Sequence, residues 1–126
     1  MPVNTLFTTN NFKKHFKKVR RNPRWFPIFT KPSRYDGTSL PPWDFVINCL
    51  IMGMPIPYYF YAHPLTIYKK LTQQIKAAVG PTSIEIKLLD LHFDDHNGDH
   101  VLVYCAIYAE HKIVLVDIGS NADLFG

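Results

Sequence analysis

Residues 100–118, "HVLVYCAIYAEHKIVLVDI", decide the fold, because they read as two strands joined by a tight turn. β-Branched and aromatic residues fill both halves, and "AEH" at 109–111 is a plausible hairpin turn. The preceding residues 83–93, "SIEIKLLDLHF", have the same character and are followed by the turn-forming run "DDHNGD" at 94–99. Three consecutive strands with short turns predict an antiparallel meander in the last third of the chain.

The beginning of the chain has a different pattern. Residues 3–7, "VNTLF", alternate and predict a short opening strand. The run "TTNN" at 8–11 offers side-chain oxygens for a helix start, and apolar residues then recur at helical spacing from Phe12 to Val19. This helix is expected to run to about Arg21, because the Asn-Pro pair that follows is a poor continuation.

Two further helices are expected in the middle of the chain. Residues 41–53, "PPWDFVINCLIMG", have prolines where a first turn tolerates them and Gly53 where a helix can end. Residues 54–65 contain three prolines and cannot be helical. Residues 66–81 have an amphipathic pattern, with Thr66 as a cap and a Gly-Pro stop. The order of strand, helices and meander predicts an α+β fold with helices on one face of the sheet.

Size and composition favour one ordinary domain. The chain has 126 residues, of which 47% are hydrophobic, enough for a core without disulfides. Cys49 and Cys105 lie in apolar runs and are expected to be buried thiols rather than disulfide or metal ligands. Residues 22–42 are rich in proline and aromatic residues, which predicts a packed surface loop. Because no apolar run is long enough for a membrane span and no leader opens the chain, a soluble, cytoplasmic protein is expected.

Positive charge is concentrated in the first half. Residues 1–63 contain nine Lys and Arg against two carboxylates, a net charge of +7, whereas residues 64–126 have a net charge of −3. The densest run is "KKHFKKVRRNPR" at 13–24. Such a run can be a solvated helix face, but its density equally favours a polyanion or an acidic protein as partner.

Three stretches together carry a family resemblance. They are "GMPIPYYFYAHPL" at 53–65, "GDHVLVY" at 98–104 and "DIGSNADLFG" at 117–126. With the opening strand and basic helix, they resemble the YafQ branch of the RelE-like toxins of bacterial toxin–antitoxin pairs. The resemblance implies a single RelE-like toxin domain over 1–126, with loops expanded at about 22–42 and 66–82.

The resemblance also implies a function. Such toxins are ribosome-dependent mRNA endonucleases (mRNA interferases) that a cognate antitoxin inhibits, and they contact DNA only through the toxin–antitoxin complex. They need no metal or cofactor and no membrane. The 2′-hydroxyl of the message attacks its own 3′-phosphate, so the protein supplies a base, a cation for the phosphorane and an acid for the leaving oxygen. A stacking side chain holds the base.

The family's catalytic positions fall on five residues of this chain: His63, His92, Asp99, Asn121 and Phe125. In this comparison Phe125 would close one wall of the site, which gives the tail a reason to be held. Asn121 stands where the family has a histidine.

Two further positions depart from the family pattern. His100 replaces the usual tryptophan. Asp117 stands where the family has a phosphate-binding arginine, and its carboxylate would repel the phosphate. Lys87, Lys112 or the pair Lys69 and Lys70 could replace the missing cation.

The RNA-binding surface is expected to consist of basic residues from the first helix, the later helix and the strand that follows it. They are Lys13, Lys14, Lys17, Lys18, Arg20, Arg21, Lys69, Lys70 and Lys87.

Other interpretations of the same residues remain open. His63 could merely cap a turn, and the residues from 94 to 98 have ordinary turn chemistry. A calcium loop starting at Asp95 fails, because its glycine position falls on His100. Zinc could use His92, His96 and His100, but a spacing of four suits a helix rather than a turn and strand. The aromatic run at 58–61 can pack in the core, stack on bases or form an antitoxin groove.

Two other functions also fit this scaffold. One is a binding module that has lost cleavage and retains an antitoxin, RNA or another target, which Asp117 and Asn121 favour. The other is a gyrase-poisoning relative, which would need no nuclease residues.

Overall fold

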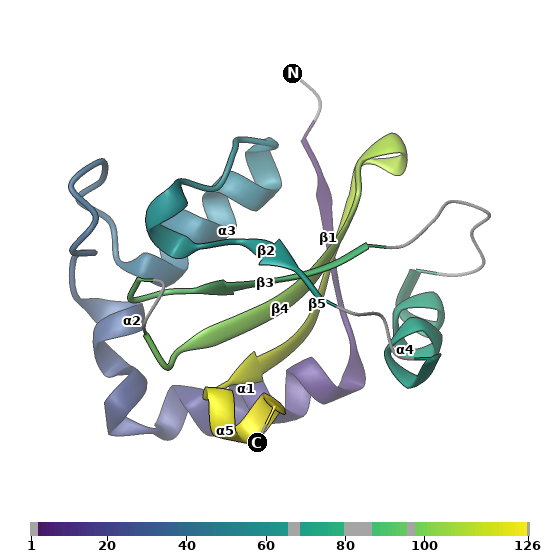
Figure 1. Ribbon diagram of the computed structural model, residues 1–126, viewed down its shortest axis with the longest axis horizontal. Helices are drawn as coiled ribbons and strands as arrows, with labels where there is room; N and C mark the ends of the chain where they lie inside the picture. Colours follow the sequence, from purple (N-terminus) through teal and green to yellow (C-terminus); the bar gives the residue numbers. More distant parts are fainter. Residues whose placement is uncertain (1–2, 66–68, 80–86, 96–97, 126) are drawn as a thin grey trace.

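The computed structural model describes residues 3–65, 69–79, 87–95 and 98–125. Within these ranges the strands form one sheet of five, in the order β1-β5-β4-β3-β2 (Figure 1). The elements along the chain, with short 3-10 turns written η, are β1 (Thr5–Thr8), α1 (Asn10–Arg21), η1 (Pro23–Trp25), α2 (Phe26–Thr30), α3 (Pro42–Met52), η2 (Tyr58–Phe60), β2 (His63–Pro64), α4 (Lys69–Val79), β3 (Lys87–His92), β4 (Val101–Ile107), η3 (Tyr108–Glu110), β5 (Lys112–Gly119) and α5 (Asn121–Phe125).

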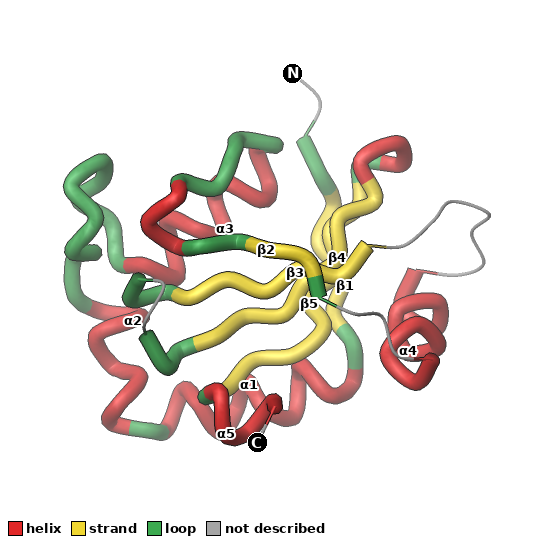
Figure 2. The backbone as a smooth tube through the Cα atoms, viewed as in Figure 1, coloured by secondary structure: helices red, strands yellow, loops and turns green. Residues whose placement is uncertain are grey.

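The antiparallel meander expected from the last third of the chain is confirmed. β3 pairs with β4 and β4 pairs with β5, both antiparallel, and every residue of β4 is buried. β2 adds to β3 antiparallel, whereas β1 pairs parallel with β5 at the other edge of the layer (Figure 2). The α+β fold predicted from the order of the elements is therefore observed.

Helix α1 begins where its sequence predicts. The Thr9 hydroxyl accepts a hydrogen bond from the Phe12 amide at 3.0 Å and donates one to the Val116 carbonyl at 2.6 Å. The first bond satisfies an amide that a helix start leaves without a partner, and the second fixes the helix to β5. Phe12 and Val19 are buried, whereas the four lysines between them and the two arginines that follow Val19 are exposed.

The segment from 22 to 42 is more regular than its prolines suggested. It contains η1 and α2, which bury Trp25, Ile28 and Phe29. Helix α3 follows, and it ends at Gly53, whose positive φ of 68° is the left-handed conformation common after a helix end. The expected cap at Thr66 and the Gly80-Pro81 stop lie outside the described residues.

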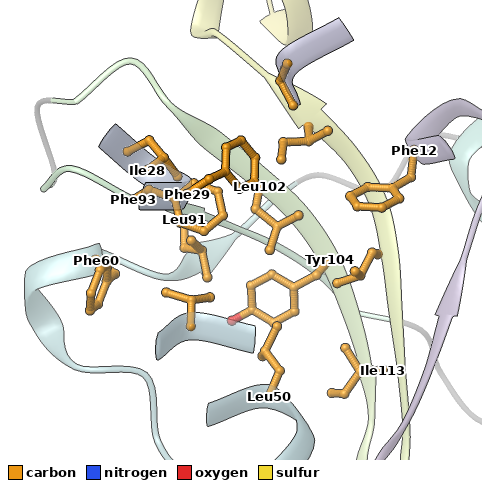
Figure 3. Packing of buried hydrophobic residues seen from close by; sticks show 14 of the residues in the cluster. Phe12, Ile28, Phe29, Leu50, Phe60, Leu91, Phe93, Leu102, Tyr104 and Ile113 are labelled. Carbon is orange, nitrogen blue, oxygen red and sulfur yellow. The ribbon is translucent and has the colours of Figure 1, made fainter. Parts of the chain in front are cut away.

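Two apolar clusters fill the two sides of the sheet. The larger one lies between the sheet and α1, α2 and α3, with Leu91, Leu102 and Tyr104 among its members (Figure 3). The smaller one takes Ile75 of α4 and Leu124 of α5 against the opposite face. The expectation of helices on one face only is therefore wrong. An amphipathic stripe shows that a helix buries one side, but not which face of the sheet it covers.

Cys49 and Cys105 are both buried, as expected, and they form no disulfide with each other. In the described ranges, none of the helices has the length and apolar character needed to span a bilayer.

Candidate functional site

His63, Asp90 and His92 form a polar cluster where β2 meets β3. The β2–β3 register sets His63 directly opposite Asp90. His92 is two residues further along β3, so its side chain is on the same face as that of Asp90. The Nε2 atom of His63 is 2.7 Å from Oδ1 of Asp90, and Nε2 of His92 is 3.9 Å from Oδ2. The two imidazole rings stack with their centroids 6.2 Å apart. Both predicted histidines thus come together around a carboxylate.

Backbone carbonyls orient both imidazoles. Nδ1 of His63 lies 2.9 Å from the Tyr61 carbonyl, and Nδ1 of His92 lies 2.7 Å from the Gly98 carbonyl. A carbonyl oxygen only accepts, so Nδ1 is the protonated donor in each ring. Both Nε2 atoms are therefore the reactive positions, and both face Asp90.

Asp90 is the most deeply buried member of the cluster. Only 3% of its surface is exposed, and its Oδ1 accepts no hydrogen bond from the described residues, although Nε2 of His63 is 2.7 Å away. Burial raises the pKa of Asp90 above its ordinary value, while the charges of His63 and His92 act in the opposite direction. The carboxylate consequently depends on positive charge from its two neighbours.

An aromatic surface borders the cluster. The Tyr61 ring lies 4.7 Å from that of His63 and 6.3 Å from that of His92, measured between centroids. Tyr58 meets Tyr61 edge to face and is 82% exposed. Phe60, by contrast, is fully buried. The aromatic run therefore divides into core residues and a surface platform beside the histidines.

The C-terminal tail is held by side-chain caps. The Asn121 amide donates to Oδ1 of Asp99 at 2.9 Å, so Asp99 anchors the start of α5. Ser120 and Asp123 bond reciprocally, each side chain accepting from the other's amide. Leu124 packs on the smaller apolar cluster. The held tail inferred from the sequence is therefore observed, although its anchors are polar caps and Leu124.

Phe125 itself does not join the histidine cluster. Its ring is 52% exposed and makes no aromatic contact with His63 or His92. The register places His92, Val101 and Gly119 side by side across β3, β4 and β5. α5 therefore starts two strands away from His92, and the structure brings Asp99 and Asn121 together with each other rather than with the histidines.

Asp117 has a partner that the sequence did not indicate. Its Oδ1 lies 2.5 Å from Nδ1 of His15 on α1 and also accepts from the Ile118 amide at 2.9 Å. The carboxylate in place of the family arginine is thus bound at the α1–β5 edge.

His100 is held in a separate arrangement beside the turn. Its Nδ1 lies 2.6 Å from Oδ2 of Asp94 and its Nε2 lies 2.9 Å from the Arg24 carbonyl, while its ring meets Trp25 edge to face. Both ring nitrogens are engaged, so His100 cannot complete a zinc site with His92. His96, the third residue of that set, lies outside the described residues.

The lysines that could replace the family's phosphate-binding arginine lie in different parts of the structure. Lys112 starts β5 at the end opposite Gly119 and pairs with Glu110 at 3.1 Å, which removes it from the histidine end. Lys69, Lys70 and Lys87 belong to α4 and β3, but their side chains lie outside the described residues. On α1 the six basic residues are exposed: Lys13, Lys14, Lys17, Lys18, Arg20 and Arg21.

Asp90 and His15 were not identified from the sequence, whereas base stacking by the aromatic run at 58–61, which includes Tyr61, was one of the alternatives left open. For Asp90 a signal was present: a carboxylate in the middle of an apolar strand, two residues before a histidine, shares a face with it. The pairing of His15 with Asp117 spans most of the chain and left no local signal.

Crystal structures of bacterial toxins share this fold. A copper-bound mutant toxin from Helicobacter pylori is 20% identical over 97% of this chain and 99% of its own, with a TM-score of 0.59. A metal-bound toxin from Helicobacter pylori is 21% identical over 97% and 99%, with a TM-score of 0.58. The E. coli DinJ–YafQ complex matches at 17% identity over 98% and 99%, with a TM-score of 0.58. No protein-family model and no curated protein matches the sequence.

Proposed function

We propose that this chain, which has the fold of the YafQ-like toxins, is the toxin of a type II toxin–antitoxin pair that cleaves mRNA on the ribosome. The fold supports the toxin assignment, since the similar E. coli structure is a complex of YafQ with DinJ. The nuclease assignment rests on one observation, the pair of oriented imidazoles that flank the buried Asp90.

His63 is the residue best placed to exchange a proton with RNA. About a third of its side chain, 34%, is exposed, whereas His92 is 7% exposed overall. With Nδ1 bound to the Tyr61 carbonyl, its Nε2 can take the proton of the attacking 2′-hydroxyl. The base then becomes an imidazolium beside Asp90.

Asp90 and His92 support that step. The Asp90 carboxylate stabilises the imidazolium that forms on His63, as a buried carboxylate does for a catalytic histidine elsewhere. His92 lies on the other side of Asp90, and when its Nε2 is also protonated it can pass that proton toward the leaving oxygen. The cluster thus contains a base, an acid and an orienting group.

The cation that the phosphorane needs comes from the imidazolium and the basic surface rather than from position 117. His15 offsets the Asp117 carboxylate at 2.5 Å, which lessens its repulsion of phosphate. The exposed basic face of α1 attracts the RNA backbone. Lys69, Lys70 and Lys87 remain proposed RNA contacts.

The remaining proposed site residues position the message. Tyr61 and Tyr58 form a platform on which a base can stack beside His63. Asp99 and Asn121 fix α5, and the exposed Phe125 offers a second stacking position for a neighbouring nucleotide.

An antitoxin is the proposed protein partner. The exposed positive face of α1 suits an acidic segment, and an antitoxin bound there would also deny the ribosome access. DNA would be reached only through the toxin–antitoxin complex. The cytoplasm is the compartment in which these partners meet.

A second candidate is a binding module without cleavage. Asp117 favours it, because a carboxylate replaces the arginine of the family pattern and its partner is His15, which carries a charge only when protonated. Such a module would keep the antitoxin surface and lose catalysis.

Tightly controlled expression with mapping of message ends in cells separates the two. We expect growth arrest with cleaved messages from the natural chain and intact messages from His63→Ala. His111→Asn is the matched control, because His111 is exposed, far along the sheet, and its φ of 53° suits asparagine. Growth arrest with intact messages from the natural chain would refute the nuclease.

A further inference from the structure

We propose that His63, Asp90 and His92 form a binding site for a divalent transition-metal ion of the zinc type. One potential ligand atom from each residue lies within 4.8 Å of the others. All three residues come from paired strands, β2 and β3, so their spacing is fixed by the sheet register rather than by a loop. The proposal concerns binding, and it stands apart from whether the protein cleaves RNA.

The contact between His63 and Asp90 has the geometry of two ligands of one ion. Their atoms are 2.7 Å apart, yet Asp90 Oδ1 accepts no hydrogen bond from the described residues. The nitrogen and oxygen thus lie close together without a hydrogen bond between them, and an ion could bind both. Ligand atoms at about 2.0–2.1 Å from a tetrahedral ion lie about 3.3 Å apart. Nε2 of His63 is 2.7 Å from Oδ1 of Asp90, Nε2 of His92 is 3.9 Å from Oδ2, and one ligand atom from each residue lies within 4.8 Å of the others, so side-chain rotations could bring the three atoms to that spacing.

The hydrogen bonds that the two histidines make through Nδ1 are also those expected around a metal site. Metal-bound histidines almost always donate their other ring N–H to a carbonyl or carboxylate. Here Nδ1 of His63 donates to the Tyr61 carbonyl and Nδ1 of His92 donates to the Gly98 carbonyl. Neutral imidazoles would then present two lone pairs to a buried carboxylate. Such an arrangement needs a cation between them, which is either a proton or a metal ion.

The burial of the ligands indicates how the ion would enter. Asp90 and His92 are 3% and 7% exposed and form the floor, whereas His63 is open to solvent on one side. A buried carboxylate oxygen without a hydrogen bond is costly unless it is paired. The ion would supply that pairing and leave one coordination position for water.

The donor set selects the metal. Two imidazole nitrogens and one carboxylate suit zinc or copper, whereas calcium and magnesium prefer sites made of oxygen alone. The Cys49 and Cys105 thiols do not belong to the set.

The site carries a consequence that rests on the proposed function. A metal held by both Nε2 atoms removes both imidazoles from proton transfer. Zinc would therefore inhibit cleavage rather than support it.

Metal binding by the full chain tests the site directly. Titration calorimetry with Zn²⁺ and the visible absorption of bound Co²⁺ give stoichiometry and ligand type without any assay of RNA. We expect one ion per chain, with no sulfur-to-cobalt band and a raised Tm in Zn²⁺. His63→Gln and His92→Gln each remove one ligand and should weaken binding at least tenfold. His111→Asn removes a surface histidine outside the site and should bind as the natural chain does.

The outcomes are distinct. If the natural chain binds no ion saturably, or if His92→Gln binds as tightly as the natural chain while circular dichroism shows it folded, the site does not exist. Asp90→Asn serves as the isosteric check where a glutamine variant is unfolded, and it too should bind more weakly. Zinc binding at this site in a protein that never cleaves RNA would leave the metal site standing and refute the nuclease.

Discussion

His63 and Asp90 face each other across the β2–β3 pair, with Nε2 2.7 Å from Oδ1, although they are 27 positions apart in the chain. The register of a two-residue strand brings about this approach. β2 consists only of His63 and Pro64, it follows Tyr61 in a left-handed conformation with φ of 50°, and the Leu65 amide adds one further bond to the Leu88 carbonyl at 2.9 Å. The position of His63 therefore depends on a strand of two residues and on the hydrogen bond from its Nδ1 to the Tyr61 carbonyl.

Replacing Asp90 should strongly reduce the rate of cleavage, although the proposed mechanism gives Asp90 no direct contact with the RNA. Asp90→Asn removes the charge that stabilises the His63 imidazolium while keeping the shape. We expect a loss of about a hundredfold or more in cleavage rate, the size typical of an electrostatic or acid–base group. Single-turnover cleavage of a ribosome-bound message measures it, with Asp36→Asn, on the exposed surface, as control. An unchanged rate in Asp90→Asn would exclude the assigned role.

Removing the negative charge at position 117 should raise activity. Asp117→Asn keeps an oxygen for the Ile118 amide but abolishes the repulsion of phosphate. We expect cleavage to increase severalfold, because an unfavourable charge near the phosphorane is lost. The same assay applies, and a decrease would show that the His15–Asp117 pair contributes to catalysis.

The His100–Asp94 pair predicts a dependence of stability on pH. Burial alone would lower the pKa of His100, but the hydrogen bond and charge of Asp94 raise it overall above its ordinary value. A raised folded pKa contributes stability that is complete below the unfolded value of about 6.5 and is lost as pH rises through the folded value.

Asp94 limits the stability of the pair at low pH. Burial alone would raise its pKa, but the hydrogen bond and charge of His100 lower it overall. This contribution is complete above the unfolded value of about 3.9 and is lost as pH falls through the folded value.

Urea unfolding tests the contribution of His100. The free energy of unfolding of His100→Gln should lose the dependence on pH above neutrality that the natural chain shows. The account of this pair fails if both chains show the same slope there.

Asp99 is predicted to hold the tail. Asp99→Ala removes the acceptor of the Asn121 amide, at a typical cost of about 1 kcal/mol for a lost cap. α5 should then be trimmed faster by a carboxypeptidase. Asp95→Ala is less suitable as control, because Asp95 has a positive φ of 107° in a turn. Asp44→Ala, at an exposed position of α3, is preferred. Equal trimming rates would show that Leu124 and the Ser120–Asp123 bonds alone hold the tail.

Charge on α1 should govern association with polyanions. Reversing Lys14 and Lys18 to glutamate should weaken ribosome binding and flatten its dependence on salt, since fewer counterions are released. Lys31→Glu with Arg34→Glu makes the same charge change outside α1. If both double variants weaken binding equally, overall charge rather than the α1 face is responsible.

Much of the fold could be predicted because its signals are local. Thr9 caps α1 through the next turn, Gly53 ends α3, and the β-rich composition of the last third produces the meander. The side of the sheet that α4 covers could not be predicted, because Ile75 packs on residues far along the chain.

The site was predictable only in part. His63 and His92 were identified through a family pattern, and the structure places them together. Asp90 was overlooked because it lies within an apolar strand and looks like an interruption of its pattern. The same pattern placed Phe125 at the site; α5 starts at the end of β5, two strands from β3, and Phe125 makes no ring contact with either imidazole, so its part in the site stays a prediction.

The chemistry of the cut ends tests the central claim most directly. Purified protein, ribosomes and a defined message should yield fragments with 2′,3′-cyclic phosphate and 5′-hydroxyl ends, because the 2′-oxygen is the nucleophile, and His63→Ala should yield none. Fragments with 3′-hydroxyl and 5′-phosphate ends, or uncut messages from the natural chain, would contradict it.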